Sequence, residues 1–124
     1  MYKRQGPQGV SIADGSKIVI EHPGTYNIQF SAQVTRTSGG NSADIEIWLR
    51  QNGADFPNST TAITLQANAQ KEVAAWNFFV TTTAPNEYFE LAWASKEPSM
   101  QLLYRVKNST PAIPSVILTV NQVN

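Results

Sequence analysis

The chain has 124 residues and a mass of 13.6 kDa, enough for one domain with its own core, and its lack of cysteine excludes disulfides, thiolate metal sites and cysteine nucleophiles. Nine basic and nine acidic residues cancel, and only 15% of positions are charged, which argues against nucleic acid as a partner. No apolar stretch approaches the roughly 18 residues of a transmembrane helix, so we expect no membrane insertion.

Turn residues divide the chain into short extended segments. Asp14-Gly15, Pro23-Gly24 and Asn52-Gly53 are typical turn pairs. Between such turns we predict strands at residues 17–21, 25–36, 43–51, 60–68, 71–83, 87–95, 101–106 and 114–123. Eight strands at this spacing indicate an all-β sandwich, jelly roll or barrel. Residues 1–9 are polar, and we expect a lead or linker there, followed by a single domain at 10–124.

The longest uninterrupted alternation has one apolar face and one uncharged polar face. Successive side chains of a strand point to opposite faces, which gives residues 25–34 an apolar face of Tyr26, Ile28, Phe30, Ala32 and Val34. The opposite face consists of Thr25, Asn27, Gln29, Ser31 and Gln33. A face exposed to water usually carries Lys or Glu, and this one carries neither. It suits contact with another protein, because interface cores are depleted in these residues.

Other predicted strands also alternate. In 43–51 the apolar set is Ile45, Ile47 and Leu49, opposite Glu46, Trp48 and Arg50. In 71–83 the apolar set is Ala74, Trp76, Phe78 and Val80, opposite Ala75, Asn77, Phe79 and Thr81. In 114–123, Val116, Leu118 and Val120 oppose Ser115, Ile117, Thr119 and Asn121, and in 87–95 Phe89, Leu91 and Trp93 share a face. Several second faces are therefore neutral, although so few charges also leave neutral faces by chance.

Ordered motifs carry a family resemblance. They are "IVIEHPGTYNIQF" at 18–30, "DIEIWLRQNG" at 44–53, "VAAWNFFV" at 73–80, the turn at Asn86-Glu87 and "PAIPSVILTVNQV" at 111–123. In this order the chain resembles the complement globular-head and tumour necrosis factor-like jelly rolls, and more closely the tailed-bacteriophage virion proteins of that fold. The first strand of such domains has an apolar run and pairs with the last strand, whereas residues 1–9 here are polar.

The resemblance implies a compact homotrimer packed around a three-fold axis through the face of one sheet. The positions that we expect at this interface are Asn27, Gln29, Ser31, Gln33, Phe79 and Ile117. Amides could pair there across subunits, while charge would be costly. The alternative for Phe79 and Ile117 is packing beneath a loop of the same subunit.

Catalytic and metal-binding patterns are absent from the sequence. The one histidine, His22, precedes Pro23-Gly24 and is expected to be an exposed turn residue. Asp44 and Glu46 share a strand face, but Arg50 on the same face favours a solvated charged surface over a calcium site. We expect no enzyme activity and no cofactor.

A ligand or receptor site is more consistent with the loops of such a scaffold. The candidates are Trp48, Phe56, Asn58, Tyr104 and Arg105, because aromatic faces next to amides suit sugars or a protein surface. Trp48 and Phe56 have the alternative of ordinary packing.

Two functions follow from the resemblance, and both are non-enzymatic. The first is a structural accessory protein at the virion surface, such as a capsid decoration or a head or tail fibre component, with capsid or fibre proteins as partners. The alternative is a receptor-binding tip or lectin-like module that recognises a host surface glycan or protein.

Overall fold

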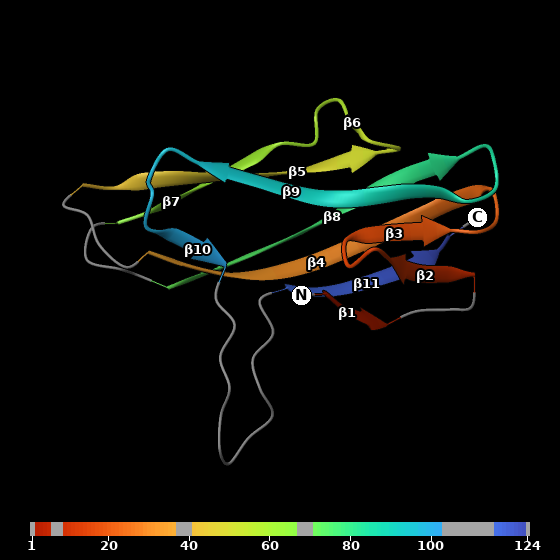
Figure 1. Cartoon of the computed structure of the whole chain (residues 1–124), viewed down its shortest axis with the longest axis horizontal. Coiled ribbons are helices and arrows are strands. Elements are labelled where there is room, and N and C mark those ends of the chain that lie inside the picture. Colours follow the sequence, from red (N-terminus) through yellow and green to blue (C-terminus); the bar gives the residue numbers. More distant parts are fainter. Residues whose placement is uncertain (1, 6–8, 37–40, 67–70, 103–115, 124) are drawn as a thin grey trace, which may run out of the picture.

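The fold is an all-β sandwich of two sheets, as the sequence predicts (Figure 1). A computed structural model of the chain describes residues 2–5, 9–36, 41–66, 71–102 and 116–123. These residues contain no helix. The strands are β1 (Tyr2–Gln5), β2 (Val10–Ala13), β3 (Lys17–Ile20), β4 (Gly24–Arg36), β5 (Ala43–Gln51), β6 (Ala54–Asp55), β7 (Thr61–Leu65), β8 (Glu72–Thr82), β9 (Glu87–Ser95), β10 (Met100–Leu102) and β11 (Val116–Gln122).

Sheet A is built around the long strand β4. One side of β4 pairs with β8, and the other side pairs first with β11 and then with β10. Strand β1 lies beyond β11 and runs parallel to it, at the edge of the sheet. A strand therefore forms within the polar segment 1–9, for which the sequence leaves open a lead or linker or a first strand that is built differently.

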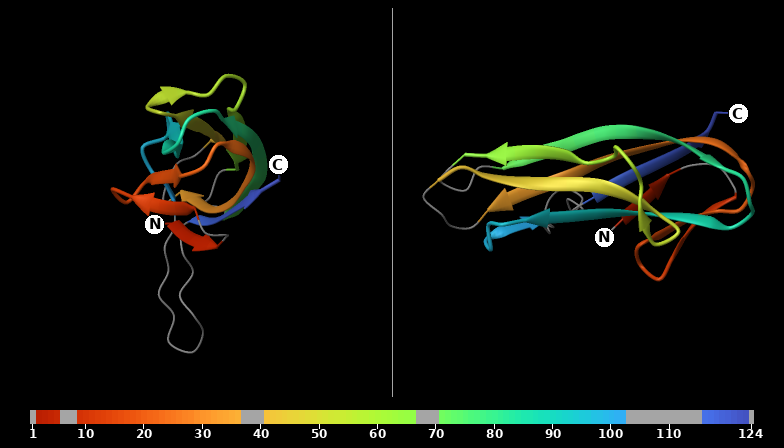
Figure 2. Two further views of the ribbon diagram at one scale, coloured as in Figure 1. Left: turned by 90° about the vertical axis from the view of Figure 1, so that its right-hand side faces the viewer. Right: turned by 90° about the horizontal axis from the view of Figure 1, so that it is seen from above.

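Sheet B has the order β2, β3, β9, β5, and its strands are antiparallel. Both β6 and β7 pair with the far side of β5. The two sheets lie face to face along the long direction of the molecule, as the two further views show (Figure 2).

Turn residues with positive φ connect neighbouring strands. The turn between β2 and β3 contains Asp14 at φ 52° and Gly15 at φ 75°, and the turn between β5 and β6 contains Asn52 at φ 51° and Gly53 at φ 86°. The Asn52-Gly53 pair forms a two-residue hairpin loop, where both central residues need positive φ, and residues 14–16 form a three-residue loop between β2 and β3. These turns set the register that places apolar side chains between the sheets.

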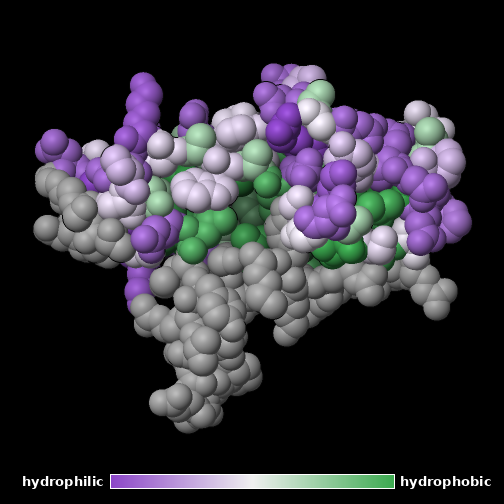
Figure 3. All heavy atoms as spheres, viewed as in Figure 1, coloured by the Kyte–Doolittle hydropathy of each residue, from purple (hydrophilic) through white to green (hydrophobic). Residues whose placement is uncertain are grey.

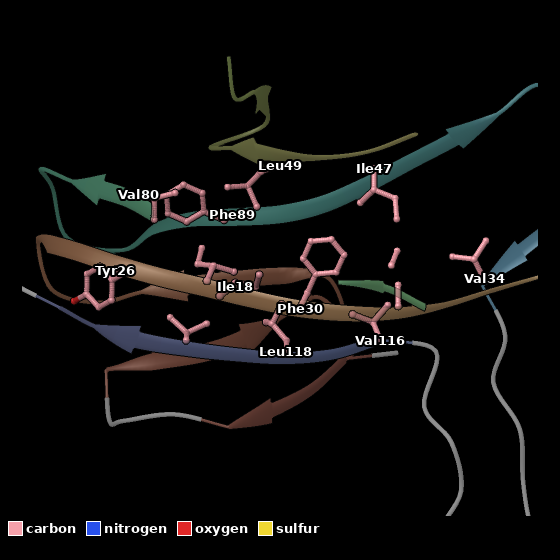
Figure 4. Packing of buried hydrophobic residues seen from close by; sticks show 14 of the residues in the cluster. Ile18, Tyr26, Phe30, Val34, Ile47, Leu49, Val80, Phe89, Val116 and Leu118 are labelled. Atoms are coloured by element: carbon pink, nitrogen blue, oxygen red, sulfur yellow. The ribbon is translucent and has the colours of Figure 1, made fainter. Parts of the chain in front are cut away.

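The core consists of the apolar sets that alternation predicts (Figure 4). Tyr26, Ile28, Phe30, Ala32 and Val34 of β4 are buried, and so are the predicted inward residues of β5 and β11. On β8, Ala74 and Val80 are buried, while Trp76 and Phe78 are half-buried against the core. The Trp76 ring meets Phe30 edge-on, with 4.6 Å between ring centroids.

Two positions depart from simple alternation. Trp93 has the parity of the buried Phe89, but it is 40% exposed, because β3 pairs only with residues 87–89 of β9 and does not extend beside Trp93. Arg36 at the end of β4 is only 1% exposed and forms an ion pair with Glu97, at 3.1 Å. The sequence alone indicates neither feature.

Candidate functional site

The outer face of sheet A carries no charged residue on strands β4, β8 and β11. This surface, here called the outer A face, is formed by Thr25, Asn27, Gln29, Ser31 and Gln33 of β4, Val73, Ala75, Asn77, Phe79 and Thr81 of β8, and Ile117, Thr119 and Asn121 of β11. All six positions that the sequence assigns to an interface lie on it.

The strand register brings the predicted residues into adjacent rows. Asn27 lies between Phe79 and Asn121, and Ser31 lies between Ala75 and Ile117. Gln29 lies between Asn77 and Thr119 in the row between them. Cross-strand neighbours on one face of a sheet are about 5 Å apart, so these rows form a continuous patch.

Apolar side chains project from this patch. Phe79 is 64% exposed, Val73 is 57% exposed and Ile117 is 38% exposed. With so much of its ring exposed, Phe79 is not packed beneath a loop of its own subunit in the described part of the chain. An uncharged face with protruding apolar groups has the composition of an interface core.

Polar groups of the outer A face bond to one another within the sheet. The Asn77 side-chain amide donates to Asn27 Oδ1 at 2.9 Å, and the hydroxyls of Thr25 and Thr81 are 3.2 Å apart. A shallow hollow of ≈ 190 Å³ lies between β4 and β11, lined by Gln29, Phe30, Ser31, Ile117 and Thr119.

The outer face of sheet B is charged by contrast. Lys17 forms an ion pair with Asp14 at 3.2 Å and lies 4.7 Å from the centre of the Tyr88 ring. The hydrogen bond to Asp14 and its negative charge raise the pKa of Lys17. Arg50 contacts Asp55 at 3.4 Å, and Asp55 also accepts a hydrogen bond from the Trp48 indole at 2.9 Å. The two outer faces therefore suit different surroundings.

The predicted ligand residues are not brought together into one site. Trp48 is a half-buried strand residue, and Phe56 packs against Phe89 in the core, with 6.5 Å between ring centroids. Asn58 is exposed in the following turn, with φ 60°. Tyr104 and Arg105 lie outside the described residues.

Sequence reasoning missed a polar hollow on the outer side of sheet B. It has a volume of ≈ 460 Å³ and is lined by Ser42, Ala43, Asp44, Glu46, Ala94, Ser95, Lys96 and Glu97. Its two walls are about 50 residues apart along the chain, and the pairing of Glu46 with Ala94 brings them together. From the sequence, only Asp44 and Glu46 of this hollow could be placed together, on one face of a strand.

An apolar cavity of ≈ 220 Å³ lies between the sheets. Phe30, Ala32, Ile47, Leu91, Trp93, Leu102 and Val116 contribute its apolar lining, and Gly15, Ser16 and Ala92 complete it. Figure 3 shows apolar residues exposed between polar ones on the face that is viewed there.

Two carboxylates are held by hydrogen bonds at turns. The backbone N–H groups of Ala84 and Thr83 donate to Glu87 and lower its pKa, and the side chains of Asn52 and Gln51 donate to its other oxygen. The backbone N–H and hydroxyl of Ser99 lower the pKa of Glu97, and Arg36 adds to this effect. The Glu87 and Glu97 carboxylates thus stabilise the turns around them.

In the part of the chain that the structure describes, the histidine and the carboxylates do not form a catalytic or metal-binding cluster. His22 is exposed in its turn, 4.0 Å from Glu21. Within the described ranges, no three His, Asp or Glu side chains are placed to hold a metal ion. The same ranges contain no helix that is long and apolar enough to cross a membrane.

The fold is a two-sheet β-sandwich, and strands β4, β8 and β11 carry no charged residue on the outer face of sheet A. The chain matches no model of a known protein family, and no curated protein has a matching sequence.

Proposed function

We propose that this chain is a tumour necrosis factor-like jelly-roll subunit that forms a compact homotrimer through its outer A face. The strand pairing supports this topology. The first strand, β1, pairs with the last, β11; inside that pair β3 pairs with β9, β4 with β8, and β5 with β7. The last three of these pairs are antiparallel and nested, as in a jelly roll built from two Greek keys, whereas β1 runs parallel to β11 and departs from that pattern.

Two observations support the trimer: the outer A face has no charged residue, and Phe79 on it is exposed. A solvated face of this extent would be expected to carry Lys or Glu, and interface cores are depleted in them. An exposed aromatic ring on such a face is the kind of residue that dominates association energy.

The role that we propose is that of a non-enzymatic structural accessory protein of a tailed-phage virion, as a capsid decoration or fibre component at the virion surface. The resemblance of "DIEIWLRQNG" and "PAIPSVILTVNQV" to such proteins supports this role. Partners would be capsid or fibre proteins. Antibodies against the recombinant protein should label intact phage particles in electron micrographs, and unlabelled particles would remove the virion role.

Solution mass tests the trimer directly. Light scattering on a size-exclusion column, at concentrations down to about the micromolar range, should give about 41 kDa, three times the chain mass of 13.6 kDa. A mass that stays near 13.6 kDa at every concentration would rule the trimer out.

A further inference from the structure

We propose that the polar hollow of sheet B binds a single hexose unit of a glycan. The hollow lies where β5 begins and β9 ends, at the left of Figure 1. It is on the sheet opposite the outer A face, so this inference does not rest on the proposed trimer.

Small residues create the space. Glu46 of β5 is paired with Ala94 of β9, whose methyl group leaves room beside the longer side chain. Ala43 and Ser42 continue the floor at the start of β5. The resulting volume of ≈ 460 Å³ falls within the roughly 300–1,000 Å³ of small-molecule sites.

Some polar groups of the hollow are already used within the fold. Thr64 donates to one oxygen of Asp44, and Ser95 donates to the Asp44 backbone carbonyl. Glu97 uses its two oxygens for Arg36 and Ser99. The contacts of Asp44 hold the start of β5 to β7 and β9, and the Arg36–Glu97 ion pair holds the turn after β9 to the end of β4.

Other polar groups of the hollow have no such partner. Neither the Glu46 carboxylate nor the Lys96 ammonium has a hydrogen-bond or ion-pair partner within the described ranges, and both side chains are exposed. The hollow therefore presents a strong acceptor and a strong donor to the same ligand.

This combination favours a neutral, hydroxyl-rich ligand. Each hydroxyl both donates and accepts, so adjacent hydroxyls can bind a carboxylate and an ammonium at once. Lys96 at the rim disfavours a cation or a basic peptide, and the carboxylates of Asp44 and Glu46 disfavour an anion.

Binding can be measured with methyl glycosides of glucose, galactose, mannose and N-acetylglucosamine, by amide chemical shifts in NMR. Concentrations up to about 10 mM are needed, since a ligand held by a few hydrogen bonds is expected to bind at about millimolar affinity. At least one glycoside should shift amides at 42–46 and 94–97. Glu46→Gln should weaken that binding by about tenfold or more, because a charged acceptor is lost.

A second variant tests the space itself. Ala94→Phe should fill the hollow and abolish binding. The matched controls are Glu72→Gln, an exposed strand carboxylate of sheet A, and Ala54→Phe, an exposed strand alanine of sheet B, and both should bind as the original chain does. Amide spectra report whether each variant is folded.

Several outcomes would overturn the proposal. They are the absence of any glycoside shift, binding that is unchanged in both Glu46→Gln and Ala94→Phe, and shifts at the hollow with a tri-lysine peptide but with no glycoside. Solution mass, recorded on the same samples, separates this result from the trimer. A monomer that binds a glycoside through the hollow would contradict the proposed trimer and support the proposed glycan site.

Discussion

The Asn77 side-chain amide donates to Asn27 Oδ1 across β8 and β4, at 2.9 Å, directly beside the exposed ring of Phe79. Each amide still has an unused hydrogen-bonding group in this pair, because one donor and one acceptor have been matched. The outer A face thus offers an apolar ring and amide groups that can still form hydrogen bonds. It can associate with copies of itself without burying a charge, which is the costly element of most polar interfaces.

Gln29→Glu should weaken self-association. Gln29 is exposed in the central strand of the outer A face, between Asn77 and Thr119, so a trimer would bring three like charges close together. The repulsion is strongest at low ionic strength. Light scattering at neutral pH should show a shift from about 41 kDa toward 13.6 kDa as the protein is diluted.

The control for this change is Gln66→Glu, which makes the same substitution at an exposed position directly after β7 of sheet B. It should leave the solution mass unchanged. If Gln29→Glu assembles as well as the control does, Gln29 does not lie near a three-fold axis.

Phe79→Ser should reduce association while preserving the fold. The ring is 64% exposed in the single chain, so its removal costs the monomer little buried area. An aromatic anchor of an interface is worth about 2 kcal/mol or more on truncation, which corresponds to roughly a thirtyfold loss of affinity. Sedimentation velocity measures the change in association, and thermal unfolding reports on the fold. A trimer of unchanged affinity would place Phe79 outside the interface.

Alternation predicted the long strands β4, β5, β8, β9 and β11 and their faces because it is a local signal, whereas the short strands β2 and β6 were not predicted. The face that carries Ile28, Phe30 and Val34 can be derived from consecutive residues, and the buried face of β4 follows. The first strand could not be predicted in this way. Tyr2–Gln5 has no apolar alternation, and it is a strand because its backbone pairs with β11, more than 100 residues later in the chain.

The polar hollow and the buried ion pair depend on contacts that no local pattern encodes. Arg36 would be expected at the surface from its type, and its burial is possible because Glu97, 61 positions later, supplies the opposite charge. Phe56 is also placed by a contact that its local sequence does not encode. Its loop position suggested a ligand contact, whereas its ring packs against Phe89.

Trp76→Ala should destabilise the monomer by about 3 kcal/mol, the lower end of the range for large aromatic truncations, because Trp76 is half-buried against Phe30. Trp76→Phe should cost less than about 1 kcal/mol. It keeps a ring and removes an indole N–H that is buried with no hydrogen-bond partner in the described part of the chain. Urea unfolding of the two variants gives both values. A Trp76→Phe variant that is as unstable as Trp76→Ala would mean that the indole N–H has an essential partner.

Glu87→Gln should lower stability at neutral pH and have less effect in acid. The Ala84 and Thr83 N–H groups lower the folded-state pKa of Glu87 from its ordinary 4.5, so the ionised form stabilises the fold above pH 4.5. That contribution is lost as the pH falls through the lowered folded-state pKa, where the carboxyl becomes protonated. The melting temperatures of the original chain and of Glu87→Gln should therefore differ at pH 7 and converge toward about pH 3. Glu21→Gln, an exposed carboxylate in the turn that precedes β4, is the control and should show little difference at either pH. A gap between Glu87→Gln and the original chain that stays constant across this range would mean that the Glu87 contacts act through shape and hydrogen bonding alone, without the charge.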